Sequence, residues 1–202
     1  SVAACRKATQ EGYSTIVMPG HYFYFDMRQS QREPGHNWAA IFDASKVLAF
    51  DFEKEGFTKE EMKNVAGIQA SFFSELYISH LEDESDYLQY QTYPRICSLS
   101  EVAWCGKGGE WKEFYSRLTN AHYGRMLAMG IDFRLAPPTI KYEDGVLSAA
   151  TTDRSHIYYN EVGDAETHLY VEPIKTDKPA RYVFHTKQGG ARSGDVAVEA
   201  HY

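Results

Sequence analysis

Only two β-type runs occur in the first 135 residues of the chain, and segments with helical signals lie between and around them. The runs are residues 14–18 and 66–73. Strands that alternate with helices are typical of βα units with a parallel sheet. A parallel sheet is normally buried on both faces, so two strands are too few to form a complete one. The pattern therefore predicts an α/β fold of which this chain holds two βα units.

The helical segments are predicted from their caps and from the spacing of their apolar residues. Gly12 and Gly130 stand where a glycine usually ends a helix. Pro94 must begin a new helical segment or kink the one that contains it. Together the signals predict helices over residues 2–11, 43–50, 87–104 and 110–129, and a short one with a Thr58–Glu61 capping box.

The texture of the sequence changes after Pro137-Pro138, where no further amphipathic helix is predicted. Turn signals such as Asp144-Gly145 separate short β-type runs there. We therefore expect two domains, an α/β part over residues 1–136 and a small all-β, sandwich-like module over residues 137–202. The predicted strands of this module are residues 140–149, 156–159, 168–171, 180–185 and 195–200.

Charge and cysteine content exclude several classes of function. The net charge is −7 and no block of Lys or Arg occurs, which argues against nucleic-acid or anionic-membrane partners. No apolar run approaches the ~20 residues that span a bilayer. The spacing of Cys5, Cys97 and Cys105 fits no metal site, and we expect neither a metal nor another cofactor. Cys97 and Cys105 are interpreted as buried thiols.

Aromatic and acidic side chains gather after both predicted strands. In βα folds the working residues follow the carboxyl ends of the strands, and residues 21–38 form a long aromatic loop of the kind that is usually functional. Carboxylates accept hydrogen bonds from sugar hydroxyls, and flat rings cover the apolar face of a pyranose. The competing interpretation is core aromatics with solvated carboxylates. The candidates are Tyr22, Tyr24, Asp26, Trp38, Phe73 and Glu75.

Several stretches, in this order, resemble glycoside hydrolase family 20, the β-N-acetylhexosaminidases and chitobiases. Residues 17–27 with 35–40 resemble the region of the family's seventh strand, and residues 67–75 resemble its eighth. Residues 93–95 and 99–104 resemble its closing helices. The resemblance implies that residues 1–136 are the C-terminal part of a (β/α)8 TIM barrel, and that the substrates are glycans that contain N-acetylhexosamine. It also implies a secreted or periplasmic location, which is common in the family.

The resemblance also implies roles for individual residues. Tyr24 resembles the tyrosine that orients the substrate's acetamido oxygen for attack on the anomeric carbon. Asp26 resembles a carboxylate that contacts the sugar or supports that tyrosine, and Glu75 resembles the glutamate that binds the O4 and O6 hydroxyls. Trp38 resembles the tryptophan that stacks on the leaving-group sugar. Phe73 replaces a family tryptophan in the wall of the acetamide pocket.

The family's catalytic Asp-Glu pair lies in a His-x-Gly-x-Asp-Glu motif, and nothing in this sequence matches it. Asp83-Glu84 lies in an acidic run and is interpreted as a solvated helix entry. A general acid typically contributes ~10²–10⁴ in rate, so we expect no glycosidase activity from this chain alone. Its expected partner is the missing N-terminal barrel part, or a second copy.

Two alternatives of other classes stay open at this point. The chain could be a non-catalytic glycan-binding protein derived from the family, or a structural or interaction module. Of the remaining polar residues, Arg95 and Glu101 are expected in ion pairs or caps. His21 and His36 could approach a substrate, but a loop histidine is more often a satisfied polar group, which is what we expect of them.

Overall fold

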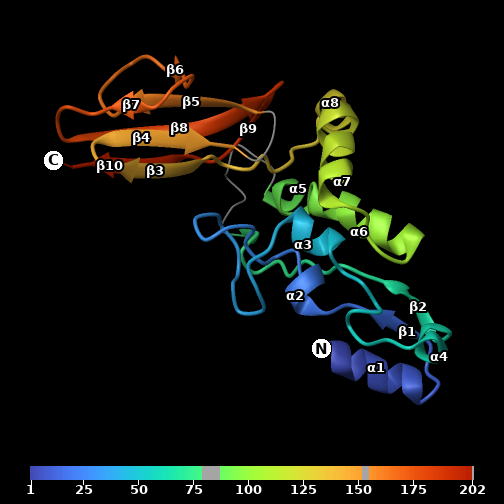
Figure 1. Cartoon of the computed structure of the whole chain (residues 1–202). Helices are drawn as coiled ribbons and strands as arrows, with labels where there is room; N and C mark the ends of the chain where they lie inside the picture. Colours follow the sequence, from blue (N-terminus) through green and yellow to red (C-terminus); the bar gives the residue numbers. More distant parts are fainter. Residues whose placement is uncertain (79–86, 152–154, 202) are drawn as a thin grey trace. The chain divides into compact units, whose positions relative to one another are not determined.

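The computed structural model describes residues 1–78, 87–151 and 155–201, which divide into two compact units, Ser1–Leu118 and Thr119–Tyr202. The chain is mixed α/β (Figure 1). Within the described residues, no helix is both long and apolar enough to cross a membrane.

The first unit contains a two-stranded parallel sheet. Strands β1 (Thr15–Val17) and β2 (Val65–Ile68) pair in parallel, as the alternating pattern predicts. The expected second strand, residues 66–73, is too long, because ladder pairing stops at Ile68. Beyond it, a single bridge joins Tyr24 to Ser71 and extends the parallel arrangement past the strand ends.

Short helices surround this sheet in the first unit (Figure 1). The Asp43 side chain caps one of them, and a capping box between Thr58 and Glu61 begins another, as predicted. The four-residue helix α2 lies inside the predicted loop, where the sequence gives no helical period. The helices are α1 (Val2–Gln10), α2 (Gly20–Phe23), α3 (Ala44–Leu48), α4 (Lys59–Met62), α5 (Tyr87–Thr92), α6 (Arg95–Cys105) and α7 (Trp111–Arg117).

An aromatic core holds the first unit together. Phe23 and Phe50 are fully buried, and their ring centroids lie 4.9 Å apart. Phe52 packs edge-to-face against both Phe50 and Phe57, with ring centroids 5.0 and 5.2 Å apart. Many of the aromatic side chains of the first unit therefore pack in its core.

The second unit consists of a helical segment and two antiparallel sheets. A π-helical turn at Leu118–His122 joins α7 to α8 (Tyr123–Ala128), so the helix predicted over residues 110–129 is present but irregular. One sheet has the order β3-β4-β7 and the other β10-β8-β5-β6, with β9 on β8. The strands are β3 (Thr139–Glu143), β4 (Val146–Ala150), β5 (His156–Glu161), β6 (His168–Leu169), β7 (Ile174–Lys175), β8 (Ala180–Gln188), β9 (Ala191–Arg192) and β10 (Val196–Ala200).

Side chains from both sheets share one core that contains Leu147, Ile157 and Phe184. The run predicted as one strand over residues 140–149 is a hairpin of β3 and β4. It turns at Asp144 and Gly145, which both have positive φ, as is typical of an Asp-Gly pair. The strands β7 and β9 have only two residues each and left no recognisable pattern in the sequence.

The two compact units meet in sequence at Leu118, and the predicted domains, residues 1–136 and 137–202, stay a prediction. Two contacts link residues 119–136 to strands of the β-rich unit. A Cβ built on Gly189 would lie 2.9 Å from Leu127 Cδ1, so α8 touches the β8–β9 turn directly. The Thr186 hydroxyl also donates to the Ala136 carbonyl at 2.8 Å.

Candidate functional site

A pocket of about 390 Å³ lies beyond the carboxyl ends of β1 and β2, within the first unit. Its volume is in the range that small-molecule sites occupy. The structure brings together there five of the six candidates, all except Tyr22, and adds His36. The lining consists of Tyr24, Asp26, His36, Trp38, Phe73 and Glu75.

The aromatic wall of this pocket depends on the parallel pairing of the two strands. The Phe25 amide donates to the Ser71 carbonyl at 2.7 Å, and the Ser71 amide donates to Phe23 at 2.9 Å. These bonds set the Tyr24 ring centroid 5.2 Å from that of Phe73. Trp38 contributes a third ring, 5.8 Å from Tyr24 and 66% exposed, so much of its surface is open to a ligand.

The loop that carries Trp38 folds back along the segment that carries Asp26. The His36 amide donates to the Asp26 carbonyl at 2.8 Å, and the Arg28 amide donates to the His36 carbonyl at 2.7 Å. Gly35 makes this approach feasible: its φ is +129°, and a Cβ there would lie 2.6 Å from the Arg28 nitrogen. His36, expected to be an ordinary loop residue, therefore lines the pocket, and the preceding glycine was the one local signal.

Asp26 is the most unusual group in the pocket. It is 1% exposed, and among the described residues neither carboxylate oxygen has a hydrogen-bond partner. Burial raises the pKa of this carboxyl, although the nearby amides of Asp26 and Phe73 and the charges of His36 and Arg95 oppose that rise. A buried acceptor without a partner, in the lining of a pocket, is suited to hydroxyl donors from a ligand.

The pocket thus combines two carboxylates with three aromatic rings. Glu75 is exposed at the pocket, whereas Asp26 is buried within its lining. Carboxylates accept from hydroxyls and ring faces cover C–H groups, so the lining is chemically suited to a polyhydroxylated ring.

Tyr22 does not belong to this site, contrary to expectation. The α2 turn directs it into the core, where its ring lies 5.1 Å from that of Phe50 and its hydroxyl donates to Glu55 at 2.8 Å. Burial and the Glu55 carboxylate raise the pKa of Tyr22 to about 12. The other rejected candidates, Asp83 and Glu84, lie outside the described residues.

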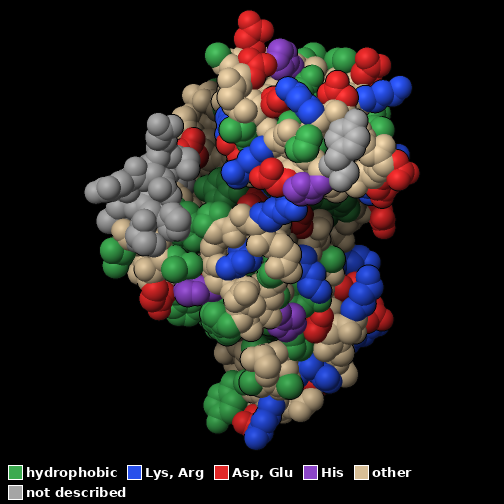
Figure 2. Space-filling view, turned by 90° about the vertical axis from the view of Figure 1, so that its left-hand side faces the viewer, with side chains coloured by type: hydrophobic (Ala, Val, Ile, Leu, Met, Phe, Trp, Pro, Cys, Tyr) green, Lys and Arg blue, Asp and Glu red, His purple; other side chains and the backbone are tan. Residues whose placement is uncertain are grey.

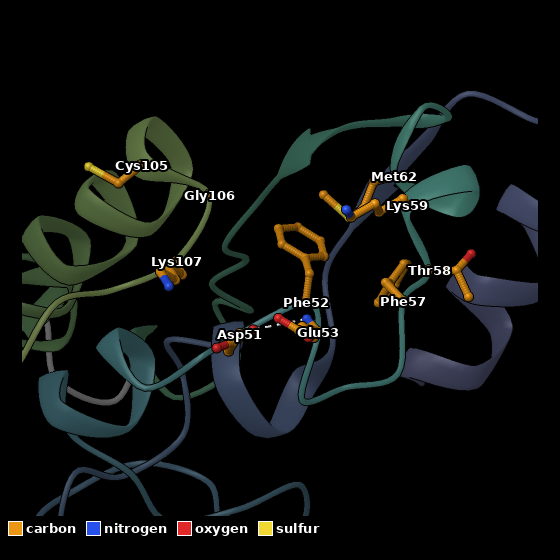
Figure 3. A pocket seen from close by; sticks show the side chains of 10 residues that line it. All are labelled: Asp51, Phe52, Glu53, Phe57, Thr58, Lys59, Met62, Cys105, Gly106 and Lys107. Carbon is orange, nitrogen blue, oxygen red and sulfur yellow. Dashed lines mark hydrogen bonds between the residues drawn. The ribbon is translucent and has the colours of Figure 1, made fainter.

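A second and larger cavity, of about 540 Å³, lies elsewhere in the first unit (Figure 3). Its lining comes from two stretches, residues 51–62 and Cys105–Lys107, and the first of these precedes the amino end of β2. Cys105 is exposed rather than buried as expected, because it is the last residue of α6. Within the part of the chain that the structure describes, no cluster of three metal-binding side chains occurs.

Charges of both signs are interspersed on the surface that Figure 2 shows. Lys and Arg side chains alternate there with Asp and Glu over the described residues of that face. This distribution agrees with the absence of a block of Lys or Arg from the sequence.

Comparison with known proteins gives a consistent set of similarities. The family described as glycosyl hydrolase family 20, catalytic domain, matches residues 1–107. The N,N'-diacetylchitobiase of Vibrio harveyi is 26% identical over an alignment that covers 69% of this chain and 20% of that protein. A β-hexosaminidase of Vibrio furnissii is also 26% identical, over 50% of this chain and 16% of that protein.

Solved structures show the same similarity in three dimensions. The exo-β-N-acetylglucosaminidase of Vibrio harveyi, in complex with N-acetylglucosamine, has a TM-score of 0.56 at 21% identity and covers 67% of this chain. The N-acetyl-β-hexosaminidase of Streptomyces plicatus has a TM-score of 0.54 at 27% identity, over 67% of this chain and 26% of that one. The chain therefore spans about a fifth of the curated relatives named here and about a quarter of the Streptomyces structure.

Proposed function

We propose, because the chain belongs to glycosyl hydrolase family 20, that it is the C-terminal part of a β-N-acetylhexosaminidase that hydrolyses terminal N-acetylhexosamine. The observation that carries this proposal is the single pocket to which the ends of two parallel strands bring Tyr24, Asp26, Trp38, Phe73 and Glu75. The relatives that match carry hexosaminidase and chitobiase names.

In this proposal β1 and β2 are the seventh and eighth strands of a (β/α)8 barrel. Residues 1–136 are the end of the barrel and residues 137–202 are a sandwich-like C-terminal module. The parallel pairing of β1 with β2 supports this assignment, and so does the small share of each relative that the chain covers. The remaining strands would come from the missing N-terminal part of the barrel.

The pocket would hold the terminal sugar and orient its own acetamido group as the nucleophile. The Tyr24 hydroxyl would donate to the acetamido oxygen, which attacks the anomeric carbon, so the reaction retains configuration without an enzyme nucleophile. Asp26 and Glu75 would accept from ring hydroxyls. Phe73 would line the acetamide pocket, and the exposed Trp38 ring would stack on the leaving-group sugar.

This sequence contains no His-x-Gly-x-Asp-Glu segment, so the chain has no proposed general acid for the leaving group. General acid catalysis is typically worth ~10²–10⁴ in rate. The chain by itself would therefore bind the product sugar without hydrolysing a glycoside.

The test compares the purified 202-residue chain with a longer product of the reading frame that includes the upstream motif. The longer protein is expected to release an aryl group from an aryl N-acetyl-β-glucosaminide, and the 202-residue chain is not. In the longer protein, Tyr24→Phe should lower kcat by about a hundredfold because the nucleophile is no longer oriented. The exposed Tyr13→Phe is the matched control and should leave kcat unchanged.

Turnover by the 202-residue chain would contradict the proposal that the chain supplies only substrate-binding residues and the missing part supplies the general acid. A reading frame without the motif, together with binding of N-acetylglucosamine, would instead indicate a non-catalytic glycan-binding protein.

A further inference from the structure

Arg95 is the largest fully buried side chain in the described structure, and it lies directly behind the pocket lining. It is the first residue of α6. Its guanidinium donates to the carbonyl oxygens of Phe25 and Met27, the latter at 2.8 Å. These two residues flank Asp26, so one side chain fixes the backbone on both sides of the buried carboxylate.

Other contacts fix the guanidinium itself. Arg95 Nε donates to the Gln91 carbonyl at 2.9 Å, and Nη2 donates to the Gln91 side-chain oxygen at 2.7 Å. The rings of Phe25 and Phe42 lie 4.8 and 5.2 Å from its central carbon and provide cation–π contacts. Gln91 also donates to the Pro34 carbonyl at 2.8 Å, which ties the same network to the loop that carries His36.

An ion pair or a cap was expected for Arg95, and the network described above adds contacts that the sequence did not indicate. The hydrogen bonds described above go to neutral oxygens. The Asp26 carboxylate also interacts electrostatically with Arg95. A buried cation is costly unless hydrogen bonds and a counter-charge compensate it. The Asp26 charge offsets part of that cost, although the burial of the Asp26 carboxyl outweighs the attraction.

We propose that Arg95 is a positioning residue of the pocket: it clamps the Phe25–Met27 backbone and keeps the buried Asp26 ionised and directed toward a bound ligand. The planar guanidinium fork reaches two carbonyl oxygens at once, which the single ammonium of lysine cannot do in the same rigid geometry. The geometric part of this proposal is independent of the ligand, and its effect on sugar binding rests on the proposed function.

The charged and titratable groups that act on Asp26 are few in the described structure. Burial opposes ionisation, whereas the charges of His36 and Arg95 favour it. Tyr87, on α5, also interacts electrostatically with both Arg95 and Asp26. Loss of the Arg95 charge should therefore shift the ionisation of Asp26 to higher pH, while burial alone would be unchanged.

The first test is a pH titration of the Asp26 carboxyl by carbon-13 NMR in the 202-residue chain. Arg95→Met is expected to raise the pKa of Asp26 above that of the wild type, and Arg95→Lys to keep it closer to wild type because the charge remains. Arg117→Met is the matched control, since Arg117 pairs with Glu101 at the surface. An unchanged Asp26 pKa in folded Arg95→Met would overturn the proposal.

Arg95→Lys decides the question if Arg95→Met does not fold. It should displace the backbone amide resonances of Asp26 and weaken N-acetylglucosamine binding about tenfold, because the charge-assisted bonds lose their geometry. In an Asp26→Asn background, Arg95→Lys should change the affinity for N-acetylglucosamine much less, since Arg95 acts through Asp26. Equal amide shifts and equal affinity in wild type and Arg95→Lys would refute a positioning role. If the wild type does not bind the sugar but Asp26 responds to Arg95, the proposed function fails and the positioning role stands.

Discussion

The rings of Tyr24 and Phe73 lie 5.2 Å apart at an interplanar angle of 69°, and each ring follows a different strand of the parallel pair. Their edge-to-face contact forms the centre of the pocket wall, and Trp38 extends it on the Tyr24 side. The wall therefore exists only when β1 and β2 are paired. Changes to these rings and to their supports should alter ligand binding more than they alter the fold.

Phe73 is 42% exposed, so substitutions there act mainly on the pocket. Phe73→Trp should strengthen N-acetylglucosamine binding and Phe73→Ala should weaken it, each by about two- to tenfold, since an aromatic contact contributes ~0.5–1.5 kcal/mol. Titration calorimetry measures both effects. Trp104→Ala, which removes a 90% exposed ring on α6, is the control and should leave affinity unchanged. Equal affinities for all variants would show that Phe73 is not part of the wall.

Gly20 lies against the Tyr24 ring: a Cβ there would be 2.9 Å from Tyr24 Cδ2. Gly20→Ala should therefore displace the ring, with a loss of about 1–3 kcal/mol in the free energy of unfolding and weaker sugar binding. Urea unfolding and calorimetry measure the two effects. The control is Gly124→Ala on α8, where a Cβ meets nothing within 4 Å; it should be neutral or stabilising. Unchanged binding in Gly20→Ala would contradict the role of Tyr24.

Asp26→Asn should stabilise the protein at neutral pH by about 1 kcal/mol while it weakens sugar binding. The raised pKa of Asp26 means that burial outweighs the attraction of its positive neighbours. The native state therefore loses stability as the pH rises from the pKa that Asp26 has in the unfolded chain to the higher pKa that it has in the folded protein. Urea unfolding at several pH values should show that Asp26→Asn is more stable than the wild type at neutral pH. This difference should vanish in acid, where the wild-type carboxyl is neutral. A loss of stability in Asp26→Asn at neutral pH would contradict this prediction. It would mean that the attraction between Arg95 and the Asp26 carboxylate outweighs the cost of burying that carboxylate.

His185, in the second unit, should make the β-rich unit sensitive to acid. It is 4% exposed, neither ring nitrogen has a hydrogen-bond partner among the described residues, and burial lowers its pKa to about 4. The unfolded chain takes up this proton near pH 6.5, so stability is lost as the pH falls from about 6.5 to about 4, by at most ~3 kcal/mol. Urea unfolding followed at β8 amide resonances measures it. His185→Phe should abolish this pH dependence, and the exposed His156→Gln should not.

The sequence predicted correctly those features that depend on a few neighbouring residues. The Thr58–Glu61 box and the Asp144-Gly145 turn are both present because each depends on contacts within a few residues. The ion pair expected for Glu101 is also present, with Arg117 as partner. The four-residue helix α2 and the two-residue strands β7 and β9 were missed, since segments this short show no period.

The site was predicted in part for the same reason. Residues that follow strands could be assigned to one edge, and Tyr24 and Glu75 do line one pocket. The direction of a side chain depends on the backbone turn before it, which sequence spacing does not reveal. For this reason Tyr22 was misplaced, and His36 was expected to be an ordinary polar group of the loop. The clamp by Arg95 joins α6 to the residues on both sides of Asp26, and a contact between segments so far apart leaves no local signal.

The most direct test of the central claim is an NMR titration of the 202-residue chain with N-acetylglucosamine. Saturable shifts are expected in the pocket, at the amides of Tyr24, Asp26, His36 and Phe73 and at the Trp38 indole N–H. Thr58 and Lys107, in the second cavity, should not shift, and Glu75→Ala should abolish the response at the pocket. Shifts that lie outside the pocket, or that persist unchanged in Glu75→Ala, would contradict the proposal that this pocket binds N-acetylglucosamine.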